Sequence, residues 1–346
     1  MTSTPAAPGP LITVLGASGF VGAAVMRALA LRPVRLRAVA RRPGVPAPGP
    51  AETTVVTADL TDRTALAEAV AGADVVVHLL LADGGWRAAE SDPGAERVNV
   101  GVMRDLVDLL GPGASAAVPP LVLYAGAASQ VGVPPREPLD GSEPDRPETA
   151  YDRQKLAAEQ LLLRATAEGR VRGVSLRLPT VFGEGAAGGG TDRGVVSAMA
   201  RRALDGRPLT MWHDGTVRRD LVHVEDVAAA FTAALDHPDS LVGGHCLIGA
   251  GRGDTLGDAF RLIARAVADR TGRRPVPVEC VDPPAHAPVT DFRSVTIDSS
   301  PFRAATGWRP RVSLCEGVRR TVDALARQQD EDRGTQVPRR SGKAGT

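Results

Sequence analysis

Apolar and polar positions alternate in a regular way through the first half of the chain. Short apolar runs predict strands at residues 11–15, 34–40, 55–57, 74–80, 121–125 and 174–178. Segments with helical periodicity lie between them, at residues 21–31, 64–71, 96–110 and 151–168. Near-continuous apolar strands that alternate with helices are typical of a parallel sheet covered on both faces. The pattern therefore predicts an α/β fold with a doubly wound parallel sheet.

The regular alternation ends after Pro179. Helices are predicted at 195–204 and 224–235, and the run 245–249 is expected to return one strand to the sheet. This pattern predicts the following division of the chain: a sheet domain at 11–178 joined by 222–249, a smaller mixed C-terminal lobe at 179–221 and 250–327, and disordered ends at 1–10 and 328–346.

A glycine-rich turn links the first predicted strand to the first predicted helix. Gly16 allows a tight turn, Gly19 lets the backbone approach a pyrophosphate, and Gly22 lets the helix pack against the strand. The helix N-terminus offers unpaired N–H groups and a positive dipole end to the phosphates. Its place between a strand and a helix distinguishes this turn from ordinary loop glycines. The sequence predicts a Rossmann-like site for a nicotinamide dinucleotide, and the rest of the turn is Ser18, Phe20 and Val21.

The end of the second predicted strand indicates which dinucleotide is bound. A site for NAD would place an acid there, to bond the ribose 2′-hydroxyl, whereas this strand ends at Arg41 and Arg42. Two guanidinium groups match a 2′-phosphate, and a solvated basic loop is the alternative. NADPH is therefore the predicted cofactor. Asp59 and Leu60, after the third strand, are candidates for contacts with the adenine, with an exposed loop as the alternative.

Tyr151 and Lys155 are candidates for acid–base chemistry. They lie four residues apart on a predicted helix, so both project from one face. A nearby ammonium stabilises a phenolate, and this lowers the pKa of the Tyr so that the phenol gives a proton near neutral pH. The spacing alone occurs by chance in many helices. Together with the glycine turn on the same sheet, it is specific.

These features together resemble the extended short-chain dehydrogenase/reductase family over nearly the whole chain. Further matching pieces are Asp59-Leu60, 75–79, Asn99, 177–183, 219–227 and 306–310. The resemblance implies that Tyr151 donates a proton and that Lys155 holds the nicotinamide ribose. It gives Asn99 a weaker role on its helix, where a surface Asn is the alternative. It also assigns Leu79 and Pro179 to the cofactor site.

One departure from the family concerns a hydroxyl. The family usually has Ser or Thr just after the strand that corresponds to residues 121–125 here, where it hydrogen-bonds the reacting oxygen. Counting back from Gly132 puts this substrate-facing position at Ala127, and Ser129 is the nearest substitute. The departure puts the efficiency of the chemistry in question, and it keeps open a catalytically impaired, dinucleotide-binding regulator.

The C-terminal lobe resembles that of enzymes acting on sugar nucleotides. Trp212 is placed to stack on a nucleobase, with a core Trp as the alternative, and Thr180 to face the sugar. Arg219 and Arg293 fall where the family places arginines on the diphosphate, with structural ion pairs as the alternative. The runs 150–156, 173–183 and 211–220 look most like the dTDP-4-keto-6-deoxyhexose 4-ketoreductases of deoxysugar and antibiotic pathways.

The main alternative within enzymes is a sugar-nucleotide epimerase or dehydratase that retains NAD. Dehydratases carry an Asp-Glu pair just after the catalytic Thr, where this chain has Ala128-Ser129. Epimerases usually show the acid-ended second strand that Arg41 and Arg42 replace. Both observations favour the reductase.

Composition narrows the remaining classes. The 346 residues carry a formal net charge of +1, which gives no electrostatic case for nucleic acid. No run approaches the roughly 20 apolar residues of a membrane helix, and residues 1–10 lack the features of a secretory signal, so a cytoplasmic protein is expected. Its three cysteines show no metal-binding spacing, and no metal is expected.

The family resemblance also implies a homodimer. The expected contact is through the helices that contain residues 99–110 and 151–168. Apolar positions beyond one helical face support it, namely Leu106, Leu109, Leu161 and Leu162, and packing within the subunit is their alternative use.

Overall fold

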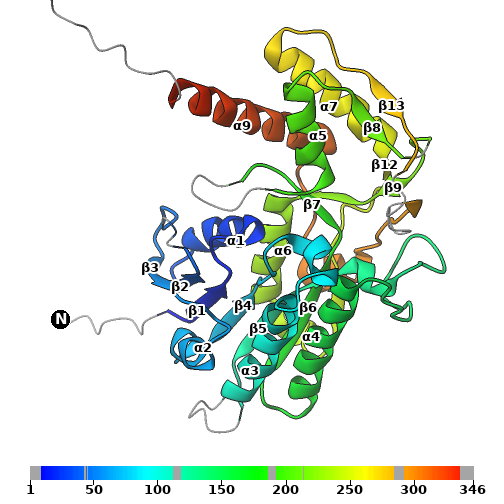
Figure 1. Ribbon diagram of the computed structural model, residues 1–346. Coiled ribbons are helices and arrows are strands. Elements are labelled where there is room, and N and C mark those ends of the chain that lie inside the picture. Colours follow the sequence, from blue (N-terminus) through cyan, green and yellow to red (C-terminus); the bar gives the residue numbers. More distant parts are fainter. Residues whose placement is uncertain are drawn as a thin grey trace, which may run out of the picture.

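The apolar strands of the first half assemble side by side into one sheet. The computed structural model describes residues 9–42, 44, 46–111, 118–185, 192–212, 214–283 and 292–335. Within them, seven parallel strands pair in the order β11-β6-β5-β4-β1-β2-β3 (Figure 1). Their bounds are β1 Leu11–Leu15, β2 Arg35–Ala40, β3 Glu52–Thr57, β4 Val75–His78, β5 Leu121–Ala127, β6 Arg172–Leu178 and β11 His245–Leu247. The predicted doubly wound parallel sheet is confirmed, and β11 returns to it as expected.

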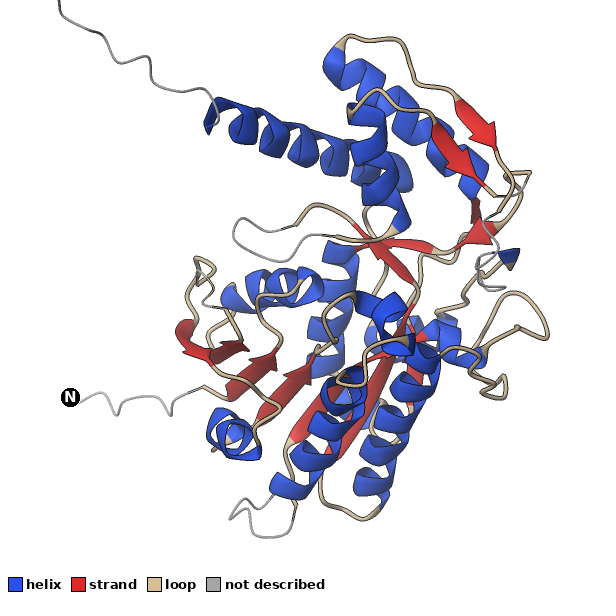
Figure 2. Cartoon of the chain, in the orientation of Figure 1, coloured by secondary structure: helices blue, strands red, loops and turns tan. Residues whose placement is uncertain are grey.

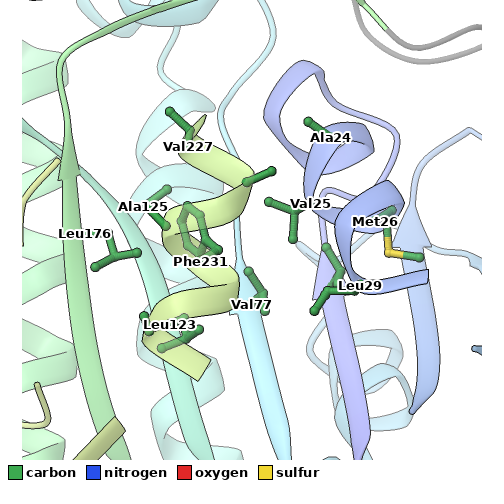
Figure 3. Close-up of a cluster of buried hydrophobic side chains, with 14 of the residues drawn as sticks. Ala24, Val25, Met26, Leu29, Val77, Leu123, Ala125, Leu176, Val227 and Phe231 are labelled. Atoms are coloured by element: carbon green, nitrogen blue, oxygen red, sulfur yellow. The ribbon is translucent and has the colours of Figure 1, made fainter. Parts of the chain in front are cut away.

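Helices cover both faces of this sheet (Figure 2). On one face lie α1 (Phe20–Ala30) and α6 (Val224–Asp236), with α8 (Ser300–Thr306) beside α6. On the other face lie α2 (Arg63–Val70), α3 (Val102–Leu109) and α4 (Ala150–Ala167). Side chains alternate along each strand, so that Val77 and Leu123 face α1 and α6 (Figure 3), while Val76 and Val122 face α2 to α4. Two apolar cores therefore form, one on each face of the sheet.

The order of the strands determines where a ligand binds. β1 pairs with β2 on one side and with β4 on the other, so the connections run in opposite directions from this point of the sheet. In open α/β sheets, ligands bind in the crevice outside the carboxyl ends of the strands at such a switch point. The glycine turn after β1 lies there.

The C-terminal lobe consists of short strands and longer helices. The strands pair as β7 (Thr180–Phe182) with β10 (Leu221–His223), β8 (Leu209–Met211) with β13 (Val278–Cys280), and β9 (Arg218–Arg219) with β12 (Asp254–Thr255). The helices are α5 (Val195–Leu204), α7 (Leu256–Thr271) and α9 (Leu314–Thr335). Apolar residues of these helices and of β8 and β10 form a third core. Figure 1 shows β7 between the large sheet and this lobe.

Short helical turns lie in four connections of the described chain, at η1 Gly85–Glu90, η2 Arg97–Gly101, η3 Ala128–Val131 and η4 Pro238–Ser240. The helix expected at residues 96–110 is not α-helical throughout. Its first part, η2, is a π-helical turn that leads directly into α3. Single π-helical turns inside helices are frequent at functional sites.

The expected disorder of the tail is wrong for residues 328–335. They continue α9, whose earlier turns are held in the third core by Val318 and Val322. A helix that is anchored by one apolar stretch continues through polar residues at little cost. Residues 336–346 lie outside the described part of the chain.

The expected disorder at the N-terminus is also wrong for Gly9 and Pro10. The backbone N–H of Arg35 donates to the carbonyl of Pro10 (3.1 Å), and its guanidinium donates to the carbonyl of Gly9 (2.9 Å). These bonds extend the pairing of β1 with β2 backwards. Residues 1–8 lie outside the described part of the chain.

Candidate active site

A cavity of about 700 Å³ opens at the switch point of the sheet. Its size is that of a pocket for a small molecule or cofactor. The cavity wall includes most of the residues predicted to bind the cofactor, namely Gly16, Ser18, Gly19, Phe20, Val21, Gly22, Arg41, Arg42, Asp59, Leu60, Leu79 and Tyr151. The other two, Lys155 and Pro179, are not in this wall. The structure therefore brings together predicted residues that follow β1, β2, β3 and β4 with predicted residues of α1 and α4.

The glycine turn has the shape that a bound pyrophosphate requires. Gly16 has φ +86°, in the left-handed region that favours glycine. A Cβ on Gly22 would lie 2.1 Å from the carbonyl oxygen of Gly16, so a side chain there is excluded. The first turn of α1 has neither a capping side chain nor an acid, and its positive end is open to an anion. The turn fits the phosphates of a dinucleotide.

Charged side chains gather at the end of the cavity near β2. Arg41 Nη2 lies 2.7 Å from Asp83 Oδ1, and Arg42 and Arg193 line the same wall. Asp59 accepts hydrogen bonds from the backbone and hydroxyl of Thr61, which lower the pKa of its carboxyl. Sequence reasoning missed Asp83 and Arg193. The position of Asp83, five residues after the end of β4, was the one signal that could have pointed to it.

Tyr151 and Lys155 occupy one face of α4, as their spacing predicts. Thr149 caps the helix by accepting from the backbone N–H of Asp152 (3.1 Å). Tyr151 is half-buried in the cavity wall. Lys155 is buried behind it, donates from Nζ to the carbonyl of Ala125 (2.9 Å) and lies 5.9 Å from the centre of the Tyr151 ring. The helix thus places a phenol and an amine together at the carboxyl end of β5.

The expected lowering of the Tyr151 pKa is not found. Desolvation, and then the negative charge of Asp152, raise the pKa of the phenol above its ordinary value. Burial lowers the pKa of Lys155 to about 8, because the charged ammonium loses hydration. The expectation considered the ammonium alone and omitted burial. The phenol keeps its proton throughout the neutral range, which is the form a proton donor needs.

The position expected to carry a hydroxyl is buried. Ala127 is the last residue of β5, and its N–H donates to Oε1 of Gln130 (2.9 Å). Ser129, in η3, donates from its hydroxyl to Oδ1 of Asp152 (2.5 Å). Asp152 also accepts from the hydroxyl of Thr149 (2.7 Å). The structure thus directs the hydroxyl of Ser129 to a carboxylate next to Tyr151.

Asn99 is buried and links the loop after β4 to α4 through its side chain. Its side-chain oxygen accepts from the backbone N–H of Ala82 (2.9 Å), and its Nδ2 donates to Oε1 of Gln154 on α4 (2.7 Å). The alternative of a surface Asn is therefore wrong. Asn99 fixes the loop after β4 against the helix of Tyr151, and the π-helical turn of η2 brings it there.

The residues predicted to bind substrate, namely Ala127, Thr180, Trp212, Arg219 and Arg293, are not among those that line the described cavity. Thr180 begins β7, and Trp212 is half-buried just after β8. Arg219, at the end of β9, donates to the carbonyl of Arg293. Arg293 Nη1 lies 2.6 Å from Oε1 of Glu148. The two predicted diphosphate-binding arginines are thus neighbours, and Arg293 makes a structural ion pair, although with a Glu and not with the nearby Asp of its alternative role.

Two further features of the described residues concern metals and membranes. These residues contain no cluster of three His, Cys, Asp or Glu side chains that could hold a metal ion. Their helices include none with the length and apolar character of a membrane span.

Comparison with known proteins identifies the family. Residues 12–249 match the NAD dependent epimerase/dehydratase family. The chain is 30% identical to dTDP-6-deoxy-L-talose 4-dehydrogenase (NAD(P)(+)) of Kitasatospora kifunensis, over 92% of this chain and 96% of that protein. It is 27% identical to dTDP-L-rhamnose 4-epimerase of Burkholderia thailandensis, over 93% and 96%.

A solved structure agrees with these matches. MoeE5 in complex with UDP-glucose and NAD is 26% identical and superposes with a TM-score of 0.76. The match covers 93% of this chain and 100% of the MoeE5 chain. The family match confirms the resemblance to extended short-chain dehydrogenases/reductases. The glycine turn, the cavity at the switch point and the Tyr151–Lys155 pair are thus features of a chain that belongs to the NAD dependent epimerase/dehydratase family.

Proposed function

We propose that the protein is an NADPH-dependent nucleotide-sugar reductase that acts on the C4 ketone of a dTDP-4-keto-6-deoxyhexose. The observation that carries the proposal is that one cavity wall holds the phenol of Tyr151, with Lys155 behind it, together with the guanidinium groups of Arg41 and Arg42 where an NAD site would have an acid. A reductase needs a proton donor, whereas an epimerase must first remove a proton from a sugar hydroxyl. The relative from Kitasatospora kifunensis is named as a 4-dehydrogenase of dTDP-6-deoxy-L-talose with NAD(P)(+). That name supports a dTDP-deoxysugar as the substrate class and C4 as the reacting position.

Residues of the cavity would hold the cofactor along its length. The turn from Gly16 to Gly22 would bind the pyrophosphate, and Arg41 and Arg42 the 2′-phosphate. Lys155 would hold the nicotinamide ribose. When bound, the reduced nicotinamide supplies the hydride for the ketone carbon.

The proton comes from the protein. As the ketone is reduced, negative charge develops on its oxygen, and Tyr151 gives its phenolic proton to that oxygen. Lys155 stabilises the phenolate that remains, because an adjacent ammonium favours a negative charge. Its lowered pKa also lets it pass a proton to the phenolate near neutral pH, which restores the donor.

The C-terminal lobe would bind the nucleotide part of the substrate. Arg219 and Arg293 would bind the diphosphate, Trp212 would stack on the base, and Thr180 would face the sugar. Ala127 leaves the ketone oxygen without the usual hydroxyl partner, so Tyr151 serves as its main hydrogen-bond donor.

A homodimer through α3 and α4 remains part of the proposal. Leu109 and Leu161 are partly buried and stay available for it. Leu106 and Leu162 are fully buried against the sheet and its helices, so their use is packing within the subunit.

The test is to incubate the purified protein with NADPH and a panel of dTDP-4-ketosugars. Stoichiometric oxidation of NADPH with formation of a C4 alcohol, identified by NMR, is the expected result. Interconversion of two sugar epimers without net use of NADPH would replace the proposal by an epimerase. Binding of NADPH without any turnover across the panel would favour the non-catalytic alternative.

A further inference from the structure

An ion pair crosses the mouth of the cofactor cavity. Arg41 follows β2 and Asp83 lies in the loop after β4, and β1 separates these two strands in the sheet. The pair of Arg41 Nη2 with Asp83 Oδ1 (2.7 Å) therefore spans the glycine turn that follows β1. Both side chains line the cavity and are 54% and 64% exposed, so the packing of the core does not require the pair.

Asp83 lies among several cations. Its hydrogen bond with Arg41, and the charges of Arg41, Arg42 and Arg193, lower the pKa of its carboxyl, which is ionised at neutral pH. The other acid at this end of the cavity, Asp59, is hydrogen-bonded to Thr61 instead. Asp83 is thus the carboxylate bonded to the guanidinium that a 2′-phosphate would need.

We propose that Asp83 sets the selectivity between NADPH and NADH by competing with the 2′-phosphate for Arg41. This inference rests on the proposed use of NADPH. A phosphomonoester carries a charge of about −1.5 to −2 at pH 7. Its binding to Arg41 breaks the pair with Asp83 and leaves the carboxylate beside a second anion. NADH lacks this phosphate and leaves the pair intact. Asp83 therefore weakens the binding of NADPH and has little effect on NADH.

The test compares cofactor affinities of Asp83→Asn and the wild-type protein. The substitution keeps the shape of an exposed side chain and removes its charge. Dissociation constants are measured by titrating NADPH and NADH fluorescence after bound nucleotide has been removed. NADPH is expected to bind about two- to fivefold more tightly, the range that exposed ion pairs give, with NADH changed by less than about 1.5-fold.

Two further variants show whether the gain acts through Arg41. In Arg41→Ala, the additional change Asp83→Asn is expected to give no more than a small further gain, because the contested guanidinium is gone. Asp239→Asn removes the same charge from another exposed pair, with Arg172, and is expected to leave both affinities unchanged.

The inference is overturned if Asp83→Asn leaves the NADPH affinity unchanged. It is also overturned if the gain is as large in the absence of Arg41, or if Asp239→Asn gives it too. Failure of the proposed reaction is a separate result. A protein that reduces no ketosugar but gains NADPH affinity in Asp83→Asn retains this inference and loses the proposed function.

Discussion

A buried ion pair holds α4, the helix of Tyr151 and Lys155, against the sheet, and its removal should lower the free energy of unfolding. Glu159 lies one helical turn beyond Lys155 on α4 and is almost completely buried, as is its partner Arg177 on β6. Arg177 donates from Nε to Glu159 Oε2 (3.0 Å) and from Nη2 to Oε1 (2.5 Å). Ser175 donates to Oε2 as well (2.6 Å). The variant Glu159→Gln keeps this shape but places an amide against a buried guanidinium.

The loss of stability depends on which groups still bind Arg177 in the variant. Breaking a buried ion pair by removing one partner costs about 3–5 kcal/mol. Asp145 still binds the same guanidinium with two hydrogen bonds (2.7 and 2.8 Å), so we expect the lower end, about 3 kcal/mol. An unfolding entropy of about 2.1 cal/mol/K per residue gives about 0.7 kcal/mol/K for a chain of 346 residues, so the melting temperature should fall by about 4 °C.

Differential scanning calorimetry checks this value against a surface control. Glu96→Gln breaks an exposed pair with Arg104 (3.3 Å) and should cost less than about 1 kcal/mol. Burial raises the pKa of Glu159, but the hydrogen bonds and the positive charge of Arg177 have the larger effect, so the pKa of Glu159 is lowered. The stability due to Glu159 is therefore present above its unfolded pKa and is lost as the pH falls through the lower folded value. A variant that melts within about 2 °C of the wild type at pH 7 would refute the reasoning.

Other expected results concern the site itself. Tyr151→Phe should keep cofactor binding and lose about 10²–10⁴-fold in turnover, as measured by NADPH oxidation; near-normal turnover would remove Tyr151 from the mechanism. Lys155 has a folded pKa of about 8 against an ordinary 10.5, so the unfolded chain binds more protons between these values. The free energy of unfolding of the wild type, relative to that of Lys155→Met, should thus rise from pH 8 to 10 by up to about 1.4 kcal/mol per pH unit, as measured by chemical unfolding. If the two proteins show the same dependence of stability on pH, the lowered pKa of Lys155 is wrong. Gly22→Ala places a Cβ 2.1 Å from a carbonyl oxygen of the turn and should weaken cofactor binding at least about tenfold, which a fluorescence titration measures. Ala127→Thr should raise kcat, because one such donor is worth about 10²–10³ in rate, whereas Ser129→Ala should lower it severely only if Ser129 has taken over that role. No change in either variant would show that the oxyanion is stabilised by another route.

Much of the fold was predictable because its signals are local. An apolar run in the sequence indicates each strand, and a stretch with helical periodicity indicates each helix. The glycine spacing from Gly16 to Gly22, between a strand and a helix, is typical of a dinucleotide-binding turn. Tyr151 and Lys155 were found because helix geometry fixes residues four apart on one face.

The features that were missed depend on tertiary structure. Asp83 and Arg193 come from loops more than a hundred residues apart, and only the order of the strands and the return of the chain from β7 bring them to one cavity wall. The raised pKa of Tyr151 depends on burial, which a helical pattern does not report. The helix at 328–335 was missed because polar residues there continue a helix whose anchors lie upstream.

The return of β11 has a consequence for folding during synthesis. β11 pairs with β6, and residues 179–244 lie between them in the chain. Until β11 has left the ribosome, β6 is an edge strand with unpaired backbone groups, and such edges promote association with other chains. The first lobe therefore cannot complete its sheet ahead of the second, and a nascent chain arrested near residue 240 should be more prone to aggregation than one arrested after residue 250 has emerged.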